Sequence, residues 1–383
     1  MWTMGLVMSV VGSVVLIATK SRKDLRISAA PLWKTGKNEI GSSGNFFTDI
    51  VDDWKNNEEE TFKKFDVDRN GLLYRSEFDE LVASLLTDPY GSPYQLSEEQ
   101  KEELFCHADP KMICSPVTKK TFRLLWKNWI RKILSPVTAL IIVDVQNDFI
   151  SGSLALVNSP AGQDGLEVVP VINGLVTEIP FDVVVYTHDW HPANHVSFVD
   201  NVALRPLHPN YTKSPDEVQV LDIVHFDDQW GTEQTMWPRH CVQQTWGAKL
   251  QENLVVVENP VKIYKGQNPD VDSYSAFFDN SRRDHTELEM ELRKRGVTDV
   301  YTSGIAYDYC VGFTSLDALD LGFRVTLVED ASRGVVDDSI AAMRTALLDK
   351  GAAIVNSTKV ADMVSGRDRN ARLAQYLMRT IKV

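Results

Sequence analysis

Four segments of this 383-residue sequence each end in side chains that could do chemistry. Each segment is a short apolar run, and the polar side chain comes directly after it. In chain order these side chains belong to Asp144, to Asp189 and His191 with His195 close by, to Lys265, and to Cys310. A carboxylate, imidazoles, an amine and a thiol include a nucleophile, a proton acceptor and ligands for a metal ion. The four segments therefore predict a catalytic site, provided that the fold brings them together.

The elements that must position these side chains begin near residue 137. From there short β-branched runs alternate with segments of helical spacing. The runs are 137–145, 181–187, 254–264, 299–305, 323–330 and 352–355, and the helical candidates are 165–177, 283–295, 311–321 and 337–349. Continuous apolar strands alternating with helices predict an α/β three-layer sandwich with a central, mainly parallel sheet. Ligands bind outside the carboxyl ends of such strands, so we expect the chemical side chains at one rim.

Ahead of this α/β domain, assigned to residues 136–383, residues 46–135 show helical spacing and contain one calcium-type loop. The twelve residues 66–77 follow the EF-hand pattern, and Gly71 stands where that loop turns sharply. Ca²⁺ prefers oxygen ligands, which we assign to Asp66, Asp68, Asn70, the carbonyl of Leu72, and Glu77. The sequence therefore predicts an all-α EF-hand domain that binds Ca²⁺.

A second helix–loop–helix is expected at residues 97–132, because EF-hands usually occur in pairs. Asp109 is its one suitable ligand, and Lys111, Ile113 and Lys120 stand where oxygens would be needed. We interpret this half as a structural partner that binds no calcium.

Residues 1–45 read as an apolar leader followed by a linker. Residues 2–19 carry no charge and are followed at once by basic residues, so they are either a membrane anchor or a peripheral leader. If they span a membrane, the positive charges that follow place the rest of the chain in the cytoplasm, and we expect an intracellular, cytoplasmic protein.

Charge and cysteine content narrow the class of protein. The chain has 40 Lys and Arg against 53 Asp and Glu, a net charge of −13, which disfavours a nucleic-acid partner. The four cysteines form no CxxC pair, so we expect the reduced thiols of an intracellular protein, with Cys310 as a catalytic candidate.

Five motifs carry a resemblance to a known family. ALIIVDVQNDF, YTHDWHPANHVSF, WPRHC, YKG and SGIAYDYCV resemble the nicotinamidases, or pyrazinamidases, of the isochorismatase-like superfamily of cysteine amidohydrolases. The resemblance covers about residues 137–383, and animal-type nicotinamidases with an N-terminal EF-hand extension are similar in architecture. It implies hydrolysis of nicotinamide to nicotinate and ammonia through a Cys310 thioester, which feeds NAD salvage.

The same resemblance implies a catalytic triad of Asp144, Lys265 and Cys310. The chemistry agrees, because a helix N-terminus and a nearby ammonium lower a thiol pKa and a carboxylate can take the thiol proton. The family places the oxyanion hole on backbone N–H groups, here those of Ala306 and Cys310, next to a cis peptide bond between Ile305 and Ala306.

A metal ion is implied at Asp189, His191 and His240, where in the family it binds the pyridine-ring nitrogen of the substrate. Two histidines and a carboxylate suit Zn²⁺, our first expectation, and also Mn²⁺ or Fe²⁺. His195 is either a further ligand or a residue that supports the ligands.

Three aromatic positions match the family's substrate-stacking residues: Phe149, Trp237 and Tyr274. Stacked rings suit a flat heteroaromatic amide.

Three other functions remain as alternatives. One is an amidohydrolase of the same superfamily that acts on another carbamoyl or ureido compound. The second is a calcium-binding regulatory protein with a degenerate enzyme domain, and the third is an EF-hand protein whose C-terminal domain is a scaffold. The complete triad and metal set disfavour the last two, and they also disfavour the superfamily's isochorismatases. Family members range from monomers to larger assemblies, so self-association stays open.

Overall fold

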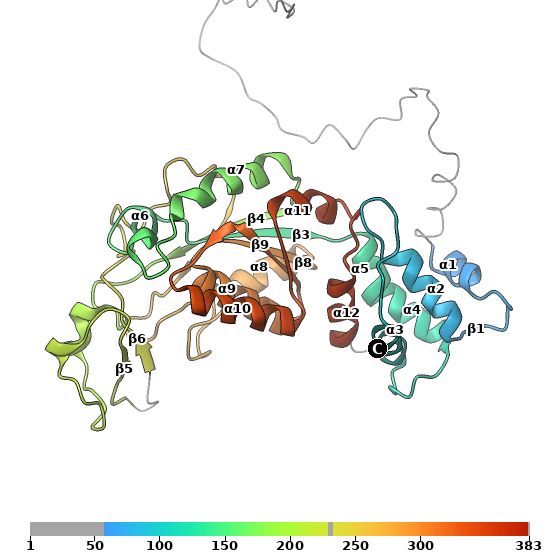
Figure 1. The fold of residues 1–383 in the computed structure, drawn as a ribbon, viewed down its shortest axis with the longest axis horizontal. Helices are drawn as coiled ribbons and strands as arrows, with labels where there is room; N and C mark the ends of the chain where they lie inside the picture. The colour runs from blue at the N-terminus through green and yellow to red at the C-terminus, as the bar shows by residue number, and fades with distance from the viewer. Residues whose placement is uncertain (1–56, 229–232, 382–383) are drawn as a thin grey trace, which may run out of the picture. The chain divides into compact units, whose positions relative to one another are not determined.

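A six-stranded sheet in the order β10-β9-β8-β3-β4-β7 is the centre of the fold (Figure 1). The computed structural model describes residues 57–228 and 233–381. Every strand pair of this sheet is parallel, which confirms the predicted topology. The strands are β3 (Thr138–Val143), β4 (Val183–Asp189), β7 (Val261–Lys265), β8 (Asp299–Ile305), β9 (Arg324–Arg333) and β10 (Ala353–Val355).

Helices cover both faces of this sheet and make the predicted three layers (Figure 1). All six residues of β3 are buried, because alternate side chains of a strand point to opposite faces. Leu140 and Ile142 join one apolar core, and Ala139, Ile141 and Val143 join the other. The first core is covered by α7 (Val168–Glu178) and α11 (Ser357–Val364), the second by α8 (Leu288–Lys294), α9 (Gly312–Asp320) and α10 (Asp337–Lys350).

Two predicted elements differ from the structure. Residues 254–257 form no strand, since the sheet edge beside β4 is taken by β7 and the side chains of Val255 and Val256 are exposed. The helix predicted at 283–295 begins only at Leu288. Ahead of it the chain turns around Asp279, whose carboxylate accepts hydrogen bonds from the backbone N–H groups of Arg283 and Asp284.

The long connection between β4 and β7 folds around a small apolar core of its own. It contains the antiparallel pair β5 (Ile223–His225) and β6 (Glu233–Thr235). The strand β6 ends two residues before Trp237, so this pair leads the chain back to the end of the sheet where His240 lies. Its core consists of Val196, Val202, Val218, Val224, Phe226 and Met236.

Residues 57–134 form two helix–loop–helix units, which we call the helical lobe. The loops of the two units are joined by a short antiparallel ladder between β1 (Leu72–Leu73) and β2 (Val117–Thr118). The helices are α1 (Glu58–Phe65), α2 (Arg75–Leu85), α3 (Glu98–Ala108) and α4 (Lys119–Leu125), which runs on through a π-helical turn (Trp126–Ile130) into α5 (Arg131–Leu134).

The second loop of the lobe is closed by side chains of the loop itself. Asp109 accepts hydrogen bonds from the backbone N–H groups of Lys111, Ile113 and Ser115 and from the Ser115 hydroxyl. Burial raises the pKa of Asp109, but these bonds outweigh burial and lower the pKa to about 2. The carboxylate is therefore ionised and fully engaged within its own loop.

A disulfide bond corrects one expectation from the sequence. Cys106 and Cys114 are joined, with their Cα atoms 4.0 Å apart, whereas Cys241 and Cys310 are free and buried. The expectation of four reduced thiols was wrong for this pair. A spacing of eight residues does not by itself indicate a disulfide bond. The two cysteines come together only because the folded chain turns back toward α3 in the loop that follows it.

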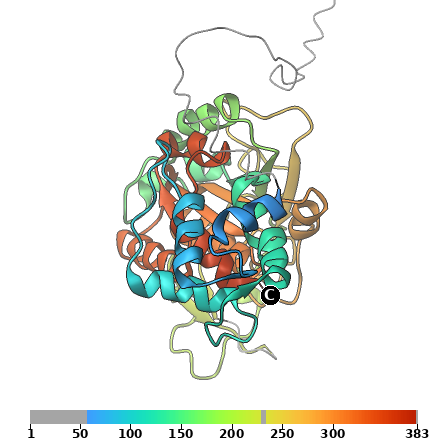
Figure 2. The ribbon, with the colours of Figure 1, turned by 90° about the vertical axis from the view of Figure 1, so that its right-hand side faces the viewer.

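The C-terminal helix α12 (Ala371–Thr380) packs with the helical lobe, far from it in sequence. Its residues Ala371, Ala374, Leu377 and Met378 belong to the same apolar core as the lobe helices. In Figure 2 the C-terminal end lies beside those helices. The lobe and α12 share one apolar core, and the sheet with its helices contains two others.

The predicted leader and linker at residues 1–45 lie outside the described residues. Within residues 57–228 and 233–381, no helix is both long and apolar enough to cross a bilayer.

Candidate active site

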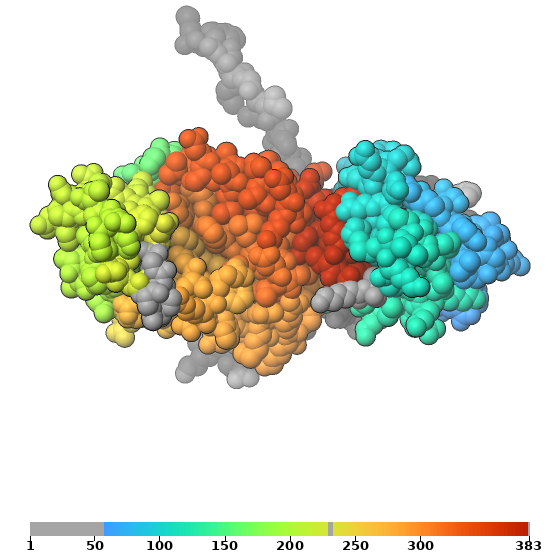
Figure 3. Space-filling view, turned by 90° about the horizontal axis from the view of Figure 1, so that it is seen from below, coloured from blue at the N-terminus to red at the C-terminus, as the bar shows by residue number. Residues whose placement is uncertain are grey.

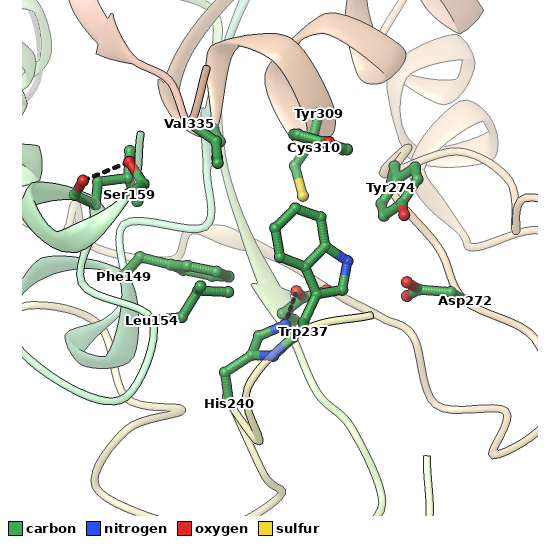
Figure 4. A pocket seen from close by; sticks show the side chains of 13 residues that line it. Phe149, Leu154, Ser159, Trp237, His240, Asp272, Tyr274, Tyr309, Cys310 and Val335 are labelled. Atoms are coloured by element: carbon green, nitrogen blue, oxygen red, sulfur yellow. Dashed lines mark hydrogen bonds and ion pairs between the residues drawn. The ribbon is translucent and has the colours of Figure 1, made fainter. Parts of the chain in front are cut away.

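A largely apolar cavity of about 470 Å³ opens at the carboxyl end of the sheet (Figure 4). In Figure 4 the Cys310 sulfur points into it beside the ring of Trp237, with His240 below. The cavity is lined by Phe149, Leu154, Leu156, Ser159, Asp189, Trp237, His240, Asp272, Tyr274, Ala306, Tyr309, Cys310 and Val335. The strand ends therefore meet at one rim, as the sequence predicts.

The ammonium group of Lys265 contacts every charged member of the predicted site. Its Nζ lies 2.9 Å from Asp144 Oδ2, 2.6 Å from Asp189 Oδ1 and 3.2 Å from Cys310 Sγ. It also donates a hydrogen bond of 2.9 Å to the carbonyl oxygen of Ser273. The structure thus brings the three predicted triad residues together around one buried cation.

Each triad residue is placed by the end of a different strand. Asp144 follows β3 and has φ 48°, so the chain turns sharply there and the carboxylate stays next to Thr187 of β4. Lys265 is the last residue of β7. Cys310 lies in the helical turn Tyr307–Val311 that follows β8, after the predicted cis bond between Ile305 and Ala306.

The charges in this cluster are set by burial and by mutual attraction. Burial lowers the pKa of Lys265, but Asp144 and Asp189 outweigh burial and hold it well above its usual range. Burial raises the pKa of Asp144, although the Lys265 ammonium pulls it down. Lys265 is therefore a permanent cation, and Asp144 is a stronger base than an exposed aspartate.

The thiol pKa differs from the expectation. We expected it to be lowered, whereas burial raises the pKa of Cys310 well above its usual range, and the carboxylates of Asp144 and Asp189 raise it further. The opposing effect of Lys265 is smaller. Cys310 thus rests as a thiol, and a nucleophile of this kind would need a nearby base at the moment of attack.

Asp189, His191 and His240 form the predicted metal-type group. The Nε2 atoms of both imidazoles face Asp189 Oδ2, at 3.2 Å for His191 and 3.5 Å for His240. Each Nδ1 bonds to a backbone carbonyl, that of Gly266 at 2.9 Å and that of Pro238 at 2.7 Å. This arrangement fixes the rings and leaves Nε2 as the ligand atom, so the donor set fits a divalent transition metal.

A glycine makes room for this arrangement. Gly266 has φ 66°, and a Cβ atom at its position would lie 2.4 Å from the His191 ring. The glycine of the YKG motif is therefore required by the contact between its carbonyl and His191.

Gln146, which the sequence analysis did not single out, clamps the backbone of Asp189 at two points. Its amide oxygen accepts the Asp189 N–H at 2.9 Å, and its amide nitrogen donates to the Asp189 carbonyl at 2.8 Å. Gln146 is completely buried and also donates to the carbonyl of Ala248. It precedes the short helix α6 (Asn147–Ile150) in the motif that follows Asp144, so that motif positions the metal-type group as well.

His195 lies beside this group without joining all of it. Its ring stacks on His191 with centroids 4.0 Å apart, and its Nδ1 bonds to the Ser197 hydroxyl at 2.8 Å. Its buried Nε2 has no hydrogen-bond partner within the described residues, and His195, His191 and Asp272 form a second group of ligand types. Burial and His191 hold the pKa of His195 well below its usual range, so the imidazole is neutral.

The three predicted aromatic residues line the cavity together with one that the sequence analysis missed. Tyr309 makes edge contacts with Trp237 and Tyr274, at centroid distances of 4.9 and 5.2 Å. Phe149 lies on the opposite side, 5.5 Å from the ring of His240. Tyr309 immediately precedes Cys310, and this position next to the predicted nucleophile could have identified it as a residue of the site.

Asp308 was also missed and supports the turn that carries Cys310. Its carboxylate accepts hydrogen bonds from the N–H groups of Val335 and Val336 at 2.9 and 3.0 Å, and from the hydroxyl of Ser339. Val335 lines the cavity, so Asp308 fixes one wall against the turn with the thiol.

The predicted calcium loop has its acidic side chains gathered in the helical lobe. Carboxylate oxygens of Asp66, Asp68 and Glu77 lie within 4.8 Å of one another. Asn70 is held by Asp68, and Leu72 begins β1. Asp66 is buried, and its Oδ1 has no hydrogen-bond partner within the described residues. An orphaned buried carboxylate oxygen in this loop fits a cation with oxygen ligands.

Comparisons with known proteins show the family to which the chain belongs. Residues 138–359 match the family model described as Isochorismatase domain. The chain is 41% identical over 202 residues to the nicotinamidase of Escherichia coli (strain K12), which covers 52% of this chain and 84% of the relative. It is 36% identical over 206 residues to the nicotinamidase of Saccharomyces cerevisiae (strain ATCC 204508 / S288c), with 52% and 89% covered.

A solved structure is also similar. It is described as Acinetobacter baumanii nicotinamidase pyrazinamidease and has a TM-score of 0.50 and 35% identity. The match covers 58% of this chain and 98% of that chain. The family model falls on the α/β part of the chain and leaves the helical lobe outside it.

The Gln146 clamp can be tested by metal binding. Replacing Gln146→Ala leaves the backbone N–H and C=O of Asp189 without partners, and loss of such a supporting residue typically weakens metal binding roughly 10–100-fold. Titration of the purified protein with Zn²⁺ measures this loss. Gln251→Ala is the matched control, because Gln251 also bonds to a backbone N–H but lies in an exposed loop. Equal Zn²⁺ affinity in both variants would contradict the assigned role of Gln146.

Proposed function

This chain belongs to the isochorismatase family, and we propose that it is a nicotinamidase, which hydrolyses nicotinamide to nicotinate and ammonia. Nicotinamidases from several organisms are 36–41% identical to it over most of their own length. The observation that carries the proposal is the Lys265 cluster, which joins the thiol of Cys310 to the carboxylate of Asp144 at the wall of an apolar cavity.

The cavity suits a flat aromatic amide. Trp237 and Phe149 offer ring faces and edges to a heteroaromatic ring, whose burial removes apolar surface from water. The amide group then lies at the Cys310 end of the cavity. A carbamoyl compound without a ring would leave this aromatic surface unused.

Acylation uses the thiol and the carboxylate together. Asp144 takes the thiol proton while Cys310 Sγ forms a bond to the amide carbon, which gives a tetrahedral intermediate. The same proton passes to the amide nitrogen, the C–N bond breaks, and ammonia leaves a thioester on Cys310. The raised pKa of Asp144 favours both transfers. It reduces the difference between the pKa values of the carboxylate and the thiol, and it makes the protonated acid available to give its proton to the amide nitrogen.

Deacylation reverses these roles with water. Asp144 removes a proton from a water molecule, the oxygen bonds to the thioester carbon, and the C–S bond breaks. The released thiolate regains its proton from Asp144, and nicotinate leaves. Lys265 stays protonated throughout and limits the charge change that the buried site must accept.

We assign the oxyanion hole to the backbone N–H groups of Ala306 and Cys310. Both residues line the cavity and are buried; Ala306 precedes the turn Tyr307–Val311, and Cys310 lies in it. Backbone donors fixed in this way need no reorganisation when negative charge develops on the carbonyl oxygen.

Asp189, His191 and His240 would hold a divalent metal ion, Zn²⁺ in our first expectation. His195 is our candidate for a further or supporting ligand, since its Nε2 is buried and free of other bonds within the described chain. A metal ion bound there supplies a Lewis acid for the pyridine nitrogen and so orients the ring. The chain's own contribution is to keep Asp189 ionised: burial raises the pKa of Asp189, but Lys265 and His191 outweigh burial and hold that pKa well below its usual range.

Two wider roles belong to the same proposal. The reaction would serve NAD salvage, since it converts the amide of a pyridine base into the acid. Ca²⁺ at Asp66, Asp68, Asn70, Leu72 and Glu77 would stabilise or modulate the enzyme; the support is the orphaned Asp66 oxygen within a group of three carboxylates.

Release of ammonia from nicotinamide tests the proposed reaction. The metal-loaded protein is expected to turn nicotinamide over, and Cys310→Ala is expected to lower the rate by roughly 10⁴-fold or more. Cys241→Ala removes the other buried free thiol and is the matched control, expected within about threefold of the parent. Retained turnover in Cys310→Ala would contradict the thioester, and an inactive parent would move the proposal to a carbamoyl or ureido substrate.

The calcium site is tested separately by thermal unfolding. Ca²⁺ should raise the melting temperature, because a ligand at about 100 times its Kd adds about 2.7 kcal/mol to the free energy of unfolding. Glu77→Gln should abolish this shift. A calcium-induced shift of equal size in both proteins would show that the ion binds elsewhere.

A further inference from the structure

The apolar core of the helical lobe has an amphipathic helix seated in it. Helix α12 presents Ala371, Ala374, Leu377 and Met378 to the lobe, at the i, i+3, i+6 and i+7 spacing of one helical face. Figure 3 shows the C-terminal surface meeting the surface of the lobe along a continuous boundary. Paired EF-hands bind target helices through an apolar groove, which is the mode of contact seen here within one chain.

Polar contacts also hold α12 against the helical lobe. The indole Nε1–H of Trp129 donates a 2.8 Å hydrogen bond to the carbonyl of Ala374, and both groups are buried. Arg379 pairs with Glu103 of α3. Just before the helix, the hydroxyl of Tyr94 donates to the carboxylate of Asp368 at 2.6 Å.

The lobe residues that contact α12 are connected to the calcium loop through α2. Glu77 lies in the first turn of α2 and closes the loop, where it accepts the N–H of Val67 at 2.9 Å. The next residue, Phe78, stacks on Trp129 with centroids 6.4 Å apart. At the far end of α2 the carbonyl of Leu85 accepts a hydrogen bond from Arg369, and Thr87 holds the Arg369 backbone at 3.0 Å.

The other side of α12 contacts the helix that follows the nucleophile. Tyr376 is buried in the core beneath α8–α10, and its hydroxyl donates a hydrogen bond to the carbonyl of Leu319 near the end of α9. Helix α9 continues directly from the turn that contains Cys310. Leu373 reaches the core on the opposite face of the sheet, so α12 joins all three large cores.

We propose that α12 is an internal target helix of the lobe and that it couples calcium occupancy of residues 66–77 to α9, the helix that follows Cys310. Calcium binding to sensor EF-hands changes the angle between the paired helices. A rotation of α2 would move Trp129, which is bonded to α12, and Leu85, which is bonded to Arg369 just before α12. Tyr376 would pass the shift to α9. The proposal rests on the calcium site proposed above but does not require that the substrate be nicotinamide.

Amide hydrogen exchange on the full chain, with and without Ca²⁺, tests this coupling. We expect calcium to change exchange by several-fold in residues 66–77, 371–380 and 312–320. Tyr376→Phe removes only the hydroxyl, so the response of 371–380 should persist and that of 312–320 should be lost. Tyr186→Phe is the matched control, because Tyr186 also donates to a backbone carbonyl but lies outside the α12 contacts.

The outcomes separate this inference from the proposed reaction. A calcium response confined to residues 58–85, or no response in any segment, overturns the coupling whatever the substrate is. Glu77→Gln should remove every response, and a response that survives this change would also overturn it.

Kinetics on nicotinamide add an independent readout. Calcium should change kcat about fivefold or more in the parent and in Tyr186→Phe, and leave kcat unchanged in Tyr376→Phe. If the parent does not act on nicotinamide, the exchange result alone decides, so the two proposals fail separately.

Discussion

One buried ammonium group organises the catalytic end of this protein. Lys265 Nζ has two carboxylates, a thiol and a carbonyl oxygen within 3.2 Å, and its side chain is fully buried. A buried charge is tolerated only when it is paired, because desolvation costs several kcal/mol per ion. The same cation therefore allows the carboxylates of Asp144 and Asp189 to be buried, and it holds the Cys310 thiol next to the metal-type group.

The sheet order explains how distant segments reach this ammonium group. Neighbouring parallel strands β8, β3, β4 and β7 deliver Cys310, Asp144, Asp189 and Lys265 to the same edge. Since β3, β4 and β8 are buried on both faces and β7 on one, their register is fixed by packing, and the positions of the polar side chains at their ends follow. The connection between β4 and β7 then brings Trp237 and His240 over the strand ends and completes the cavity.

The residues next to the strand ends could be predicted from the sequence. The contacts of the C-terminal helix with the helical lobe could not. The triad, the metal-type group and the parallel sheet follow from local apolar runs and from family motifs. The pKa of Cys310 was predicted in the wrong direction because burial, which a sequence does not display, outweighs Lys265. The structure alone shows the Cys106–Cys114 bond and the packing of α12 against the lobe, because both depend on loop and tertiary geometry. Asp308 and Tyr309 were overlooked although they lie next to Cys310 in the sequence.

We infer that the charge of Lys265 supports both the proposed thiol chemistry and the metal-type group. Lys265→Met keeps most of the side-chain length and removes the cation, so turnover and bound Zn²⁺ measured on the same folded sample test this inference. Leaving Asp144 and Asp189 buried without their partner should lower the free energy of unfolding by about 3–5 kcal/mol. A loss of the same size from the transition state corresponds to a rate about 10²- to 10⁴-fold lower, so we expect turnover to fall within that range and Zn²⁺ retention to fall with it. Turnover and Zn²⁺ content equal to those of the parent would contradict it.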